Sequence, residues 1–170
     1  MIVIEIKQRV IRRITSLKIK RRKNMYYDSI SKQNMEMSIT LFKTHCNINN
    51  VRIKTEKLFS SDIPSNVPFL MKKFYEMFAP VSIEIDQLGV KFFPYQKVFE
   101  MISHQQSDLR FIPIAFYNND VNQTAYIDRN NDGSWDLRVQ LPIGNGKVSI
   151  LGEDVFDYLI QLCKMMQPQF

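Results

Sequence analysis

One stretch of the sequence, Leu109 to Leu151, constrains the fold more than any other, because apolar and polar side chains alternate along much of it. Alternation with a period of two places the two kinds of side chain on opposite faces of an extended strand. The stretch therefore predicts half-buried antiparallel strands. Its clearest run has an apolar row at Trp135, Leu137, Val139 and Leu141, with the polar residues Asp136, Arg138 and Gln140 between them.

Turn-forming residues divide this stretch into hairpins. Asn131-Asp132-Gly133 tolerates positive φ, and it predicts a reversal that pairs the Trp135 strand with Thr124–Asp128. Leu109–Tyr117 is apolar on both faces and predicts a buried strand. Within it, Pro113 cannot donate a ladder hydrogen bond and indicates a bulge or a sheet edge.

The rest of the chain predicts three helices and further strands. Apolar residues at i, i+3, i+4 and i+7 indicate the helices, with Ser65 or Asn66 as a cap and Pro68 and Pro94 in first turns. The apolar face of the first helix is Val67, Leu70, Met71, Phe74 and Phe78. That of the second is Tyr95, Val98, Phe99 and Ile102, and that of the third is Val155, Phe156, Leu159, Leu162, Cys163 and Met166. Strands are expected at Val81–Ile85, at Val90–Phe92 after a turn at Gly89, and at Val148–Ile150 after a turn at Pro142–Gly146.

A weaker alternation precedes the first of these helices. Met35, Met37, Ile39 and Leu41 alternate with polar residues, so a strand is predicted there. A shorter strand is expected at Val51 and Ile53, after the turn-rich segment Asn47–Asn50.

These elements predict an α+β fold in a single domain over residues 35–170, with a curved antiparallel sheet flanked by helices. The chain has 170 residues, enough for one domain with a real core plus an extension. The extension is the basic N-terminal segment, residues 1–34. Its first part can be interpreted as a strand, as a basic amphipathic helix or as a poorly ordered leader.

Charge is distributed unevenly along the chain. Residues 1–24 hold nine Lys/Arg and one Glu, a charge of +8, whereas the other 146 residues hold 14 Lys/Arg and 16 Asp/Glu, a charge of −2. The stretch from Asp120 to Asp157 contains seven acids and three bases. We therefore expect the C-terminal half to favour a basic partner through long-range attraction.

Cysteine content and hydropathy indicate where the protein resides. Cys46 and Cys163 are the two cysteines, and they form no disulfide framework, which suits a reducing compartment. No apolar run approaches the roughly 18 residues of a membrane span, and charges interrupt every candidate signal segment. We expect a cytoplasmic protein without membrane contact.

Patterns typical of metal binding are incomplete. Asp128, Asn130, Asp132, Gly133 and Asp136 match positions 1, 3, 5, 6 and 9 of a calcium loop, but position 12 is Val139 instead of glutamate. A hairpin turn rich in Asn and Asp explains the same residues. His45 and Cys46 are adjacent, but a zinc site needs four converging ligands. We expect no metal and no cofactor.

Catalytic patterns are equally sparse. Glu84 and Asp86 are two residues apart on a predicted strand, so they share a face where acid–base chemistry is conceivable, as it is at His104. A solvated strand face is the simpler interpretation, and no catalytic residue is predicted. The basic run Lys18–Lys23 supports a different alternative, a nucleic-acid-associated protein that binds phosphates through its N-terminal segment.

Five short motifs make residues 55–166 resemble the SUKH superfamily, the Smi/Knr-type group. The order helix, hairpin, short helix, antiparallel strands and closing helix accompanies them. The motifs are Ile63-Pro64, Phe111-Ile112-Pro113-Ile114-Ala115, Ala125-Tyr126-Ile127-Asp128, Gly146-Lys147-Val148 and Phe156-Asp157-Tyr158-Leu159.

The resemblance implies a non-enzymatic protein-binding module. Members of that group look like immunity proteins that neutralise nuclease or other toxins, or like regulatory interaction proteins. An acidic surface suits a basic nuclease, because it pairs with the cationic cleft of the enzyme. The partner-binding residues predicted here are Asp128, Asp132, Trp135 and Asp136, although the alternation also allows Trp135 to be a core residue.

Overall fold

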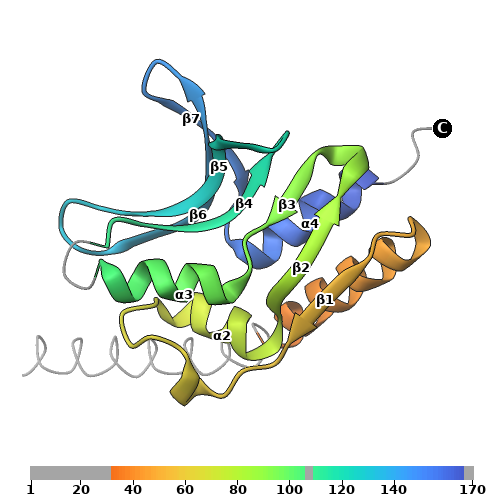
Figure 1. Cartoon of the computed structure of the whole chain (residues 1–170), viewed down its shortest axis with the longest axis horizontal. Helices are drawn as coiled ribbons and strands as arrows, with labels where there is room; N and C mark the ends of the chain where they lie inside the picture. Colours follow the sequence, from red (N-terminus) through yellow and green to blue (C-terminus); the bar gives the residue numbers. More distant parts are fainter. Residues whose placement is uncertain (1–31, 106–108, 167–170) are drawn as a thin grey trace, which may run out of the picture. The chain divides into compact units, whose positions relative to one another are not determined.

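The computed structural model describes residues 32–105 and 109–166 (Figure 1). The chain divides into two compact units, Met1–Glu36 and Met37–Phe170. Almost all of the predicted basic extension lies outside the described residues. In the described part of the second unit, an open seven-stranded antiparallel sheet is flanked by helices, which confirms the predicted α+β class.

The sheet is a simple meander in which each strand pairs with the next one along the chain. All six pairings are antiparallel. Because the order is linear and the sheet is open, its first and last strands are its two edges. The predicted hairpins are confirmed, including the turn at Gly89, where φ is +61°. The turn predicted at Pro142–Gly146 is shorter than expected, because the strand before it continues to Gly144 and Pro142 pairs with Val148. The strands are β1 (Ile53–Glu56), β2 (Ala79–Ile85), β3 (Val90–Phe92), β4 (Phe111–Tyr117), β5 (Asp120–Arg129), β6 (Trp135–Gly144) and β7 (Lys147–Gly152), with the short 3-10 helices η1 (Ser60–Asp62) and η2 (Asp86–Leu88).

Three helices form where the sequence predicts them: α2 (Phe69–Met77), α3 (Tyr95–His104) and α4 (Val155–Met166). The cap predicted for α2 at Ser65 or Asn66 is wrong. Pro68 occupies the capping position in an extended conformation, with φ −62° and ψ 150°, so the helix begins at Phe69. The Pro68 carbonyl accepts the first helical hydrogen bond, from the Lys72 N–H at 2.9 Å.

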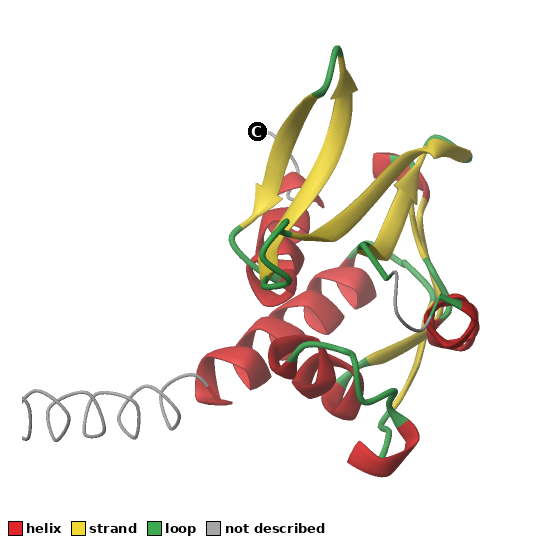
Figure 2. Cartoon of the chain, turned by 90° about the vertical axis from the view of Figure 1, so that its left-hand side faces the viewer, coloured by secondary structure: helices red, strands yellow, loops and turns green. Residues whose placement is uncertain are grey.

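The strand predicted at Met35–Leu41 is also wrong, because residues 32–48 form a helix (Figure 2). Its buried side chains in the second unit follow helical spacing and are Ile39, Phe42 and Cys46. Met37 and Leu41, which the alternation placed in the core with Ile39, are 59% and 41% exposed. Ile39 belongs to both the alternating pattern and the helical pattern. Burial of Phe42, which only the helical pattern predicts, decides for the helix.

Helix α4 provides the centre of the core. It contacts β6, β7 and α2, and seven of its residues are buried. Asp154 accepts hydrogen bonds from the N–H groups of Phe156 and Asp157, each at 2.8 Å, which satisfies donors at the helix start. Gly152 admits the close approach of β7 to this helix, since a Cβ there would lie 2.6 Å from the Tyr158 backbone nitrogen.

Aromatic rings join the helices to the sheet. Phe42 packs edge-on against Phe78 with ring centroids 5.8 Å apart, and it lies 6.0 Å from the ring of Phe92 on β3. Phe74 of α2 packs edge-on against Phe156 of α4 at 5.8 Å. Such pairs bury large apolar areas in preferred geometries, so they define how these elements dock.

Strand β4 carries the bulge predicted at Pro113. The pairing with β5 shifts between Pro113 and Ala115, an irregularity of the kind expected where a proline cannot donate a ladder hydrogen bond. The alternative prediction, a sheet edge, is wrong because β4 lies between β3 and β5.

Candidate functional site

The β5–β6 hairpin has one face in the core and the other toward solvent. Ala125, Ile127 and Val139 are fully buried on the core side. The intervening residues Tyr126 and Asp128 must point the other way, because side chains alternate along a strand. We call the outward set the hairpin face; it comprises Phe111 on β4, Tyr126 and Asp128 on β5, and Asp136, Arg138 and Gln140 on β6.

Two of the predicted partner-binding residues meet on this face. Asp128 and Asp136 are direct cross-strand partners in the β5–β6 ladder. Like charges placed opposite each other repel, so the sheet keeps this pair at some cost in stability. The pairing creates a local concentration of negative charge that the linear sequence does not show.

Arg138 offsets part of that charge. Its guanidinium donates hydrogen bonds to both carboxylate oxygens of Asp136, the shortest from Nε to Oδ1 at 2.9 Å and from Nη2 to Oδ2 at 2.6 Å. Hydrogen bonding by Arg138 lowers the pKa of the Asp136 carboxyl. Gln140 also donates to Asp136 at 3.1 Å. This hydrogen bond satisfies the Gln140 amide, which is only 7% exposed although its residue type favours solvent. Asp136 therefore holds the face together and has little freedom to bind a partner.

Asp132 lies in the turn and not on the sheet. Its carboxylate accepts hydrogen bonds from the hydroxyl of Ser134 at 2.6 Å and from the Ser134 N–H at 2.9 Å. The Ser134 hydroxyl bond is the main cause of a lowered Asp132 pKa. With Gly133 at a φ of +85°, these bonds shape the predicted reversal of the chain.

Trp135 starts β6 and pairs with Arg129 on β5. The Arg129 guanidinium lies 5.9 Å from the centre of the indole ring, a cation–π arrangement. Trp135 is half-buried and points away from the face of its neighbour Asp136. Of the four predicted residues, the structure thus brings together Asp128 and Asp136, with Asp132 in the adjoining turn and Trp135 on the opposite side.

Sequence reasoning missed the aromatic side of the hairpin face. Phe111 opposes Asp128 across the β4–β5 ladder, and its ring packs edge-on against Tyr126 with centroids 5.8 Å apart. Burial, followed by the charge of Asp128, raises the pKa of the Tyr126 phenol. The alternation in β5 already predicts that Tyr126 and Asp128 share a face. The position of Phe111 beside them follows only from the register between β4 and β5.

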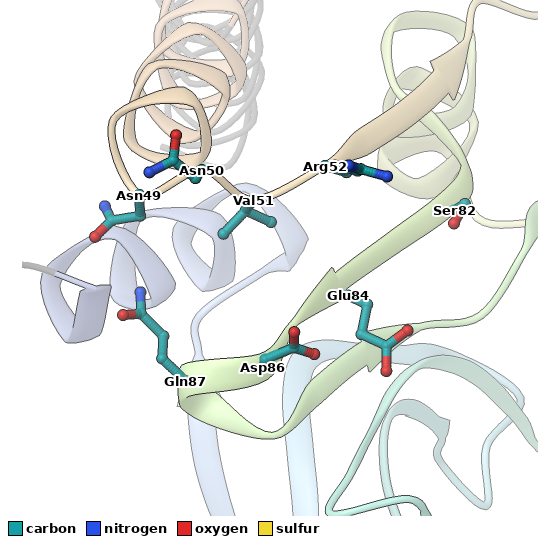
Figure 3. Close-up of a pocket in the computed structure, with 8 residues that line it drawn as sticks. All are labelled: Asn49, Asn50, Val51, Arg52, Ser82, Glu84, Asp86 and Gln87. Carbon is teal, nitrogen blue, oxygen red and sulfur yellow. The ribbon is translucent and has the colours of Figure 1, made fainter.

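A separate pocket lies at the other end of the sheet and contains the carboxylates considered for acid–base chemistry (Figure 3). This β2 pocket has a volume of about 490 Å³. Six of its eight lining residues are exposed and none is buried. The lining residues are Asn49, Asn50, Val51, Arg52, Ser82, Glu84, Asp86 and Gln87.

The carboxylates of the β2 pocket stand in an open, wet environment. Glu84 pairs with Lys91 across the β2–β3 hairpin at 3.5 Å, and both side chains are about half exposed. Exposed ion pairs of this kind contribute little energy. His104, the other residue considered for catalysis, is exposed at the end of α3 and does not line the pocket. The pocket therefore offers charge for recognition more readily than a water-excluded reaction site.

The residues that were considered as metal ligands form no ion-binding group in the described part of the chain. Among residues 32–105 and 109–166, no group of three or more His, Cys, Asp or Glu side chains is arranged to hold an ion. Cys46 and Cys163 are free and buried, which confirms the core position predicted for Cys163. No helix within the described residues is long and apolar enough to cross a membrane.

Comparisons of the chain with protein-family models, with curated proteins and with solved structures found no significant match.

Proposed function

We propose that this chain is a non-enzymatic protein-binding module that holds a basic surface of another protein against the hairpin face. The observation that carries the proposal is the cross-strand pair Asp128 and Asp136, placed beside the Phe111–Tyr126 ring pair. Aromatic area supplies affinity at interfaces, and complementary charge supplies orientation and fast association.

Asp128 is the residue best suited to meet a cationic side chain. Asp136 and Asp132 already accept short hydrogen bonds from Arg138 and Ser134, respectively. The Oδ1 atom of Asp128 accepts a hydrogen bond from the adjacent Arg129 N–H at 2.8 Å, and no described residue donates to Oδ2, so that oxygen can meet a partner.

The resemblance to the Smi/Knr-type group supports the same proposal and suggests the kind of partner. In that interpretation the chain is a toxin-neutralising immunity protein or a regulatory interaction protein, and the partner is a basic protein such as a nuclease toxin. Neutralisation then consists of covering the cationic cleft that would otherwise hold nucleic acid.

Charge reversal at Asp128 tests this proposal. Asp128→Lys replaces the repulsive pair with an attractive one to Asp136, so we expect the fold to keep or gain stability. Capture of a stoichiometric partner by the full-length protein from the cells that make it should nevertheless fall at least about tenfold. Co-expressed with a basic toxin encoded beside it, the wild type should restore growth and Asp128→Lys should not.

Glu100→Lys is the matched control, because Glu100 is exposed on α3 and the substitution changes the net charge equally. It should bind and protect like the wild type. The proposal fails if the wild type captures no stoichiometric protein partner, or if Asp128→Lys and Glu100→Lys behave alike.

A further inference from the structure

The two edges of the sheet are protected very differently. At one edge, β1 has exposed charges at Lys54 and Glu56, and its pairing with β2 is irregular at Lys54/Thr55. Charges and irregularities of this kind prevent edge strands from pairing with other chains. At the other edge, β7 contains no proline, and its single charge, Lys147, lies at its first residue.

The outer edge of β7 is unpaired within the described part of the chain. The strand bonds to β6 on one side, and no described residue hydrogen-bonds to its other side. Val148 and Ile150 lie on one face of this strand and are 40% and 41% exposed. The strand thus presents backbone donors and acceptors together with an apolar row, which is what an added strand needs.

The residue pattern of β7 is complementary to itself. If two copies pair antiparallel about a two-fold axis at Ser149, Val148 of each copy lies opposite Ile150 of the other. The apolar rows of the two copies then lie side by side on one face, and Lys147 of one copy does not lie opposite Lys147 of the other. Antiparallel pairing also brings the end that carries Lys147 next to the end of the other copy that leads into Glu153, and both side chains are exposed.

We propose that β7 is a homodimerisation edge, through which two copies of this chain join their sheets antiparallel about a two-fold axis at Ser149. The interface is isologous, so it closes after two copies and does not propagate. One edge strand buries less area than a permanent interface, so the dimer forms reversibly and depends on concentration.

Dimerisation would give the protein two binding surfaces on one sheet. β5 lies two strands in from the edge of each copy, so the two copies of β5 would be five strand spacings apart, roughly 24 Å. Both hairpin faces would then belong to the same side of the combined sheet, since Ile150, Gln140 and Tyr126 are successive cross-strand neighbours. The dimerisation itself does not depend on the proposed function.

Site-directed cross-linking tests both the edge and its register. In an antiparallel pair centred on Ser149, the two Ser149 Cα atoms lie about 4.5–5.5 Å apart, which suits a disulfide. Full-length Ser149→Cys should therefore form a covalent dimer under mild oxidation. Lys147→Cys is the matched control: its two copies are offset by four residues, about 13 Å, and should not cross-link. The native cysteines are buried and should not interfere.

Sedimentation of the uncrosslinked protein provides an independent measurement. The wild-type chain of 20.1 kDa should approach twice that mass as its concentration rises to a few hundred micromolar. The double variant Val148→Lys/Ile150→Lys should remain monomeric, because lysines then face each other across the axis. Ile48→Lys/Val121→Lys adds the same charge at other exposed positions and should still dimerise.

Mixing charge variants completes the test. Val148→Glu/Ile150→Glu should also be monomeric alone, but mixed with the lysine variant it should form a one-to-one heterodimer. The proposal is overturned if the wild type stays monomeric, if both cysteine variants cross-link equally, if the lysine variant still dimerises, or if the mixture does not associate.

Discussion

At the scale of single residues, burial keeps several ionisable groups of the core neutral. Burial raises the pKa of the Cys46 thiol to about 12 and that of Cys163 to about 11, and it raises the pKa of the Tyr75 phenol as well. In the unfolded chain, thiols ionise near pH 9 and phenols near pH 10. Above those values the folded state binds more protons than the unfolded state, so stability falls as the pH rises.

Tyr75→Phe should weaken this alkaline sensitivity. The substitution keeps the ring that packs against Phe99, with centroids 4.9 Å apart, and it removes the phenol that must stay neutral in the fold. Between pH 7 and pH 11 the variant should lose about 1.4 kcal/mol less of its unfolding free energy than the wild type. Urea titrations at the two pH values measure the difference.

Tyr95→Phe is the control for that measurement. The Tyr95 phenol is only half-buried, and its pKa is raised chiefly by its hydrogen bond to Glu56. Its removal should change the alkaline loss less than Tyr75→Phe does. Equal losses in the wild type and Tyr75→Phe would show that the buried phenol ionises freely in the folded state.

At the scale of elements, the helix at residues 32–48 shows how two periodicities can share one residue. Ile39 lies in the alternating row with Met37 and Leu41 and in the helical row with Phe42 and Cys46. Local alternation favoured a strand, but the helix puts Phe42 against the rings of Phe78 and Phe92. Tertiary contacts routinely override short local patterns in this way.

Two alanine substitutions separate the helix from the strand. Phe42→Ala should lower the free energy of unfolding by about 3–5 kcal/mol, because it opens a cavity among packed rings. Leu41→Ala should cost less than about 1 kcal/mol, since Leu41 is 41% exposed. Urea unfolding monitored by circular dichroism gives both values. A strand would reverse the order, with Leu41 the more costly position.

At the scale of the whole molecule, the charge is divided between a short basic N-terminal segment and a mildly acidic remainder. The net charge of +6 arises from residues 1–24, which carry +8, while the remaining 146 residues carry −2. The fold that is described therefore belongs to the acidic part of the chain. The basic segment, which supports nucleic-acid binding as the alternative function, lies outside the described residues.

Neutralising the basic run distinguishes the two functions in the full-length protein. Replacement of Lys18, Lys20, Arg21, Arg22 and Lys23 by Gln should abolish salt-dependent binding to duplex DNA, because phosphate contacts set the salt dependence. Capture of a protein partner through the hairpin face should be unchanged. DNA binding measured across a salt series, alongside affinity capture, checks both. Loss of partner capture in this variant would contradict a site on the hairpin face.

Much of the fold was predictable because it is encoded by local pattern. Alternation and turn residues located strands β2 to β7. Helical spacing located α2, α3 and α4, with a proline at the start of the first two. The bulge at Pro113 followed from a missing donor. The candidate site was predictable only in part. Alternation placed Asp136, Arg138 and Gln140 on one polar face of β6, and Asp128 and Asp136 were predicted to bind a partner. Phe111 was not predicted, because it joins the hairpin face only through the register between β4 and β5.

By itself the sequence determined the positions of the strands and helices after residue 50, which face of most of them is apolar, and how charge is divided along the chain. These follow from the chemistry of near neighbours, which acts at short separations whatever the rest of the chain does. The tertiary structure alone decided that residues 32–48 are helical, that Asp128 opposes Asp136, and that no described strand pairs with the outer edge of β7. Those outcomes depend on long-range packing and register, which bring together residues that no local pattern relates.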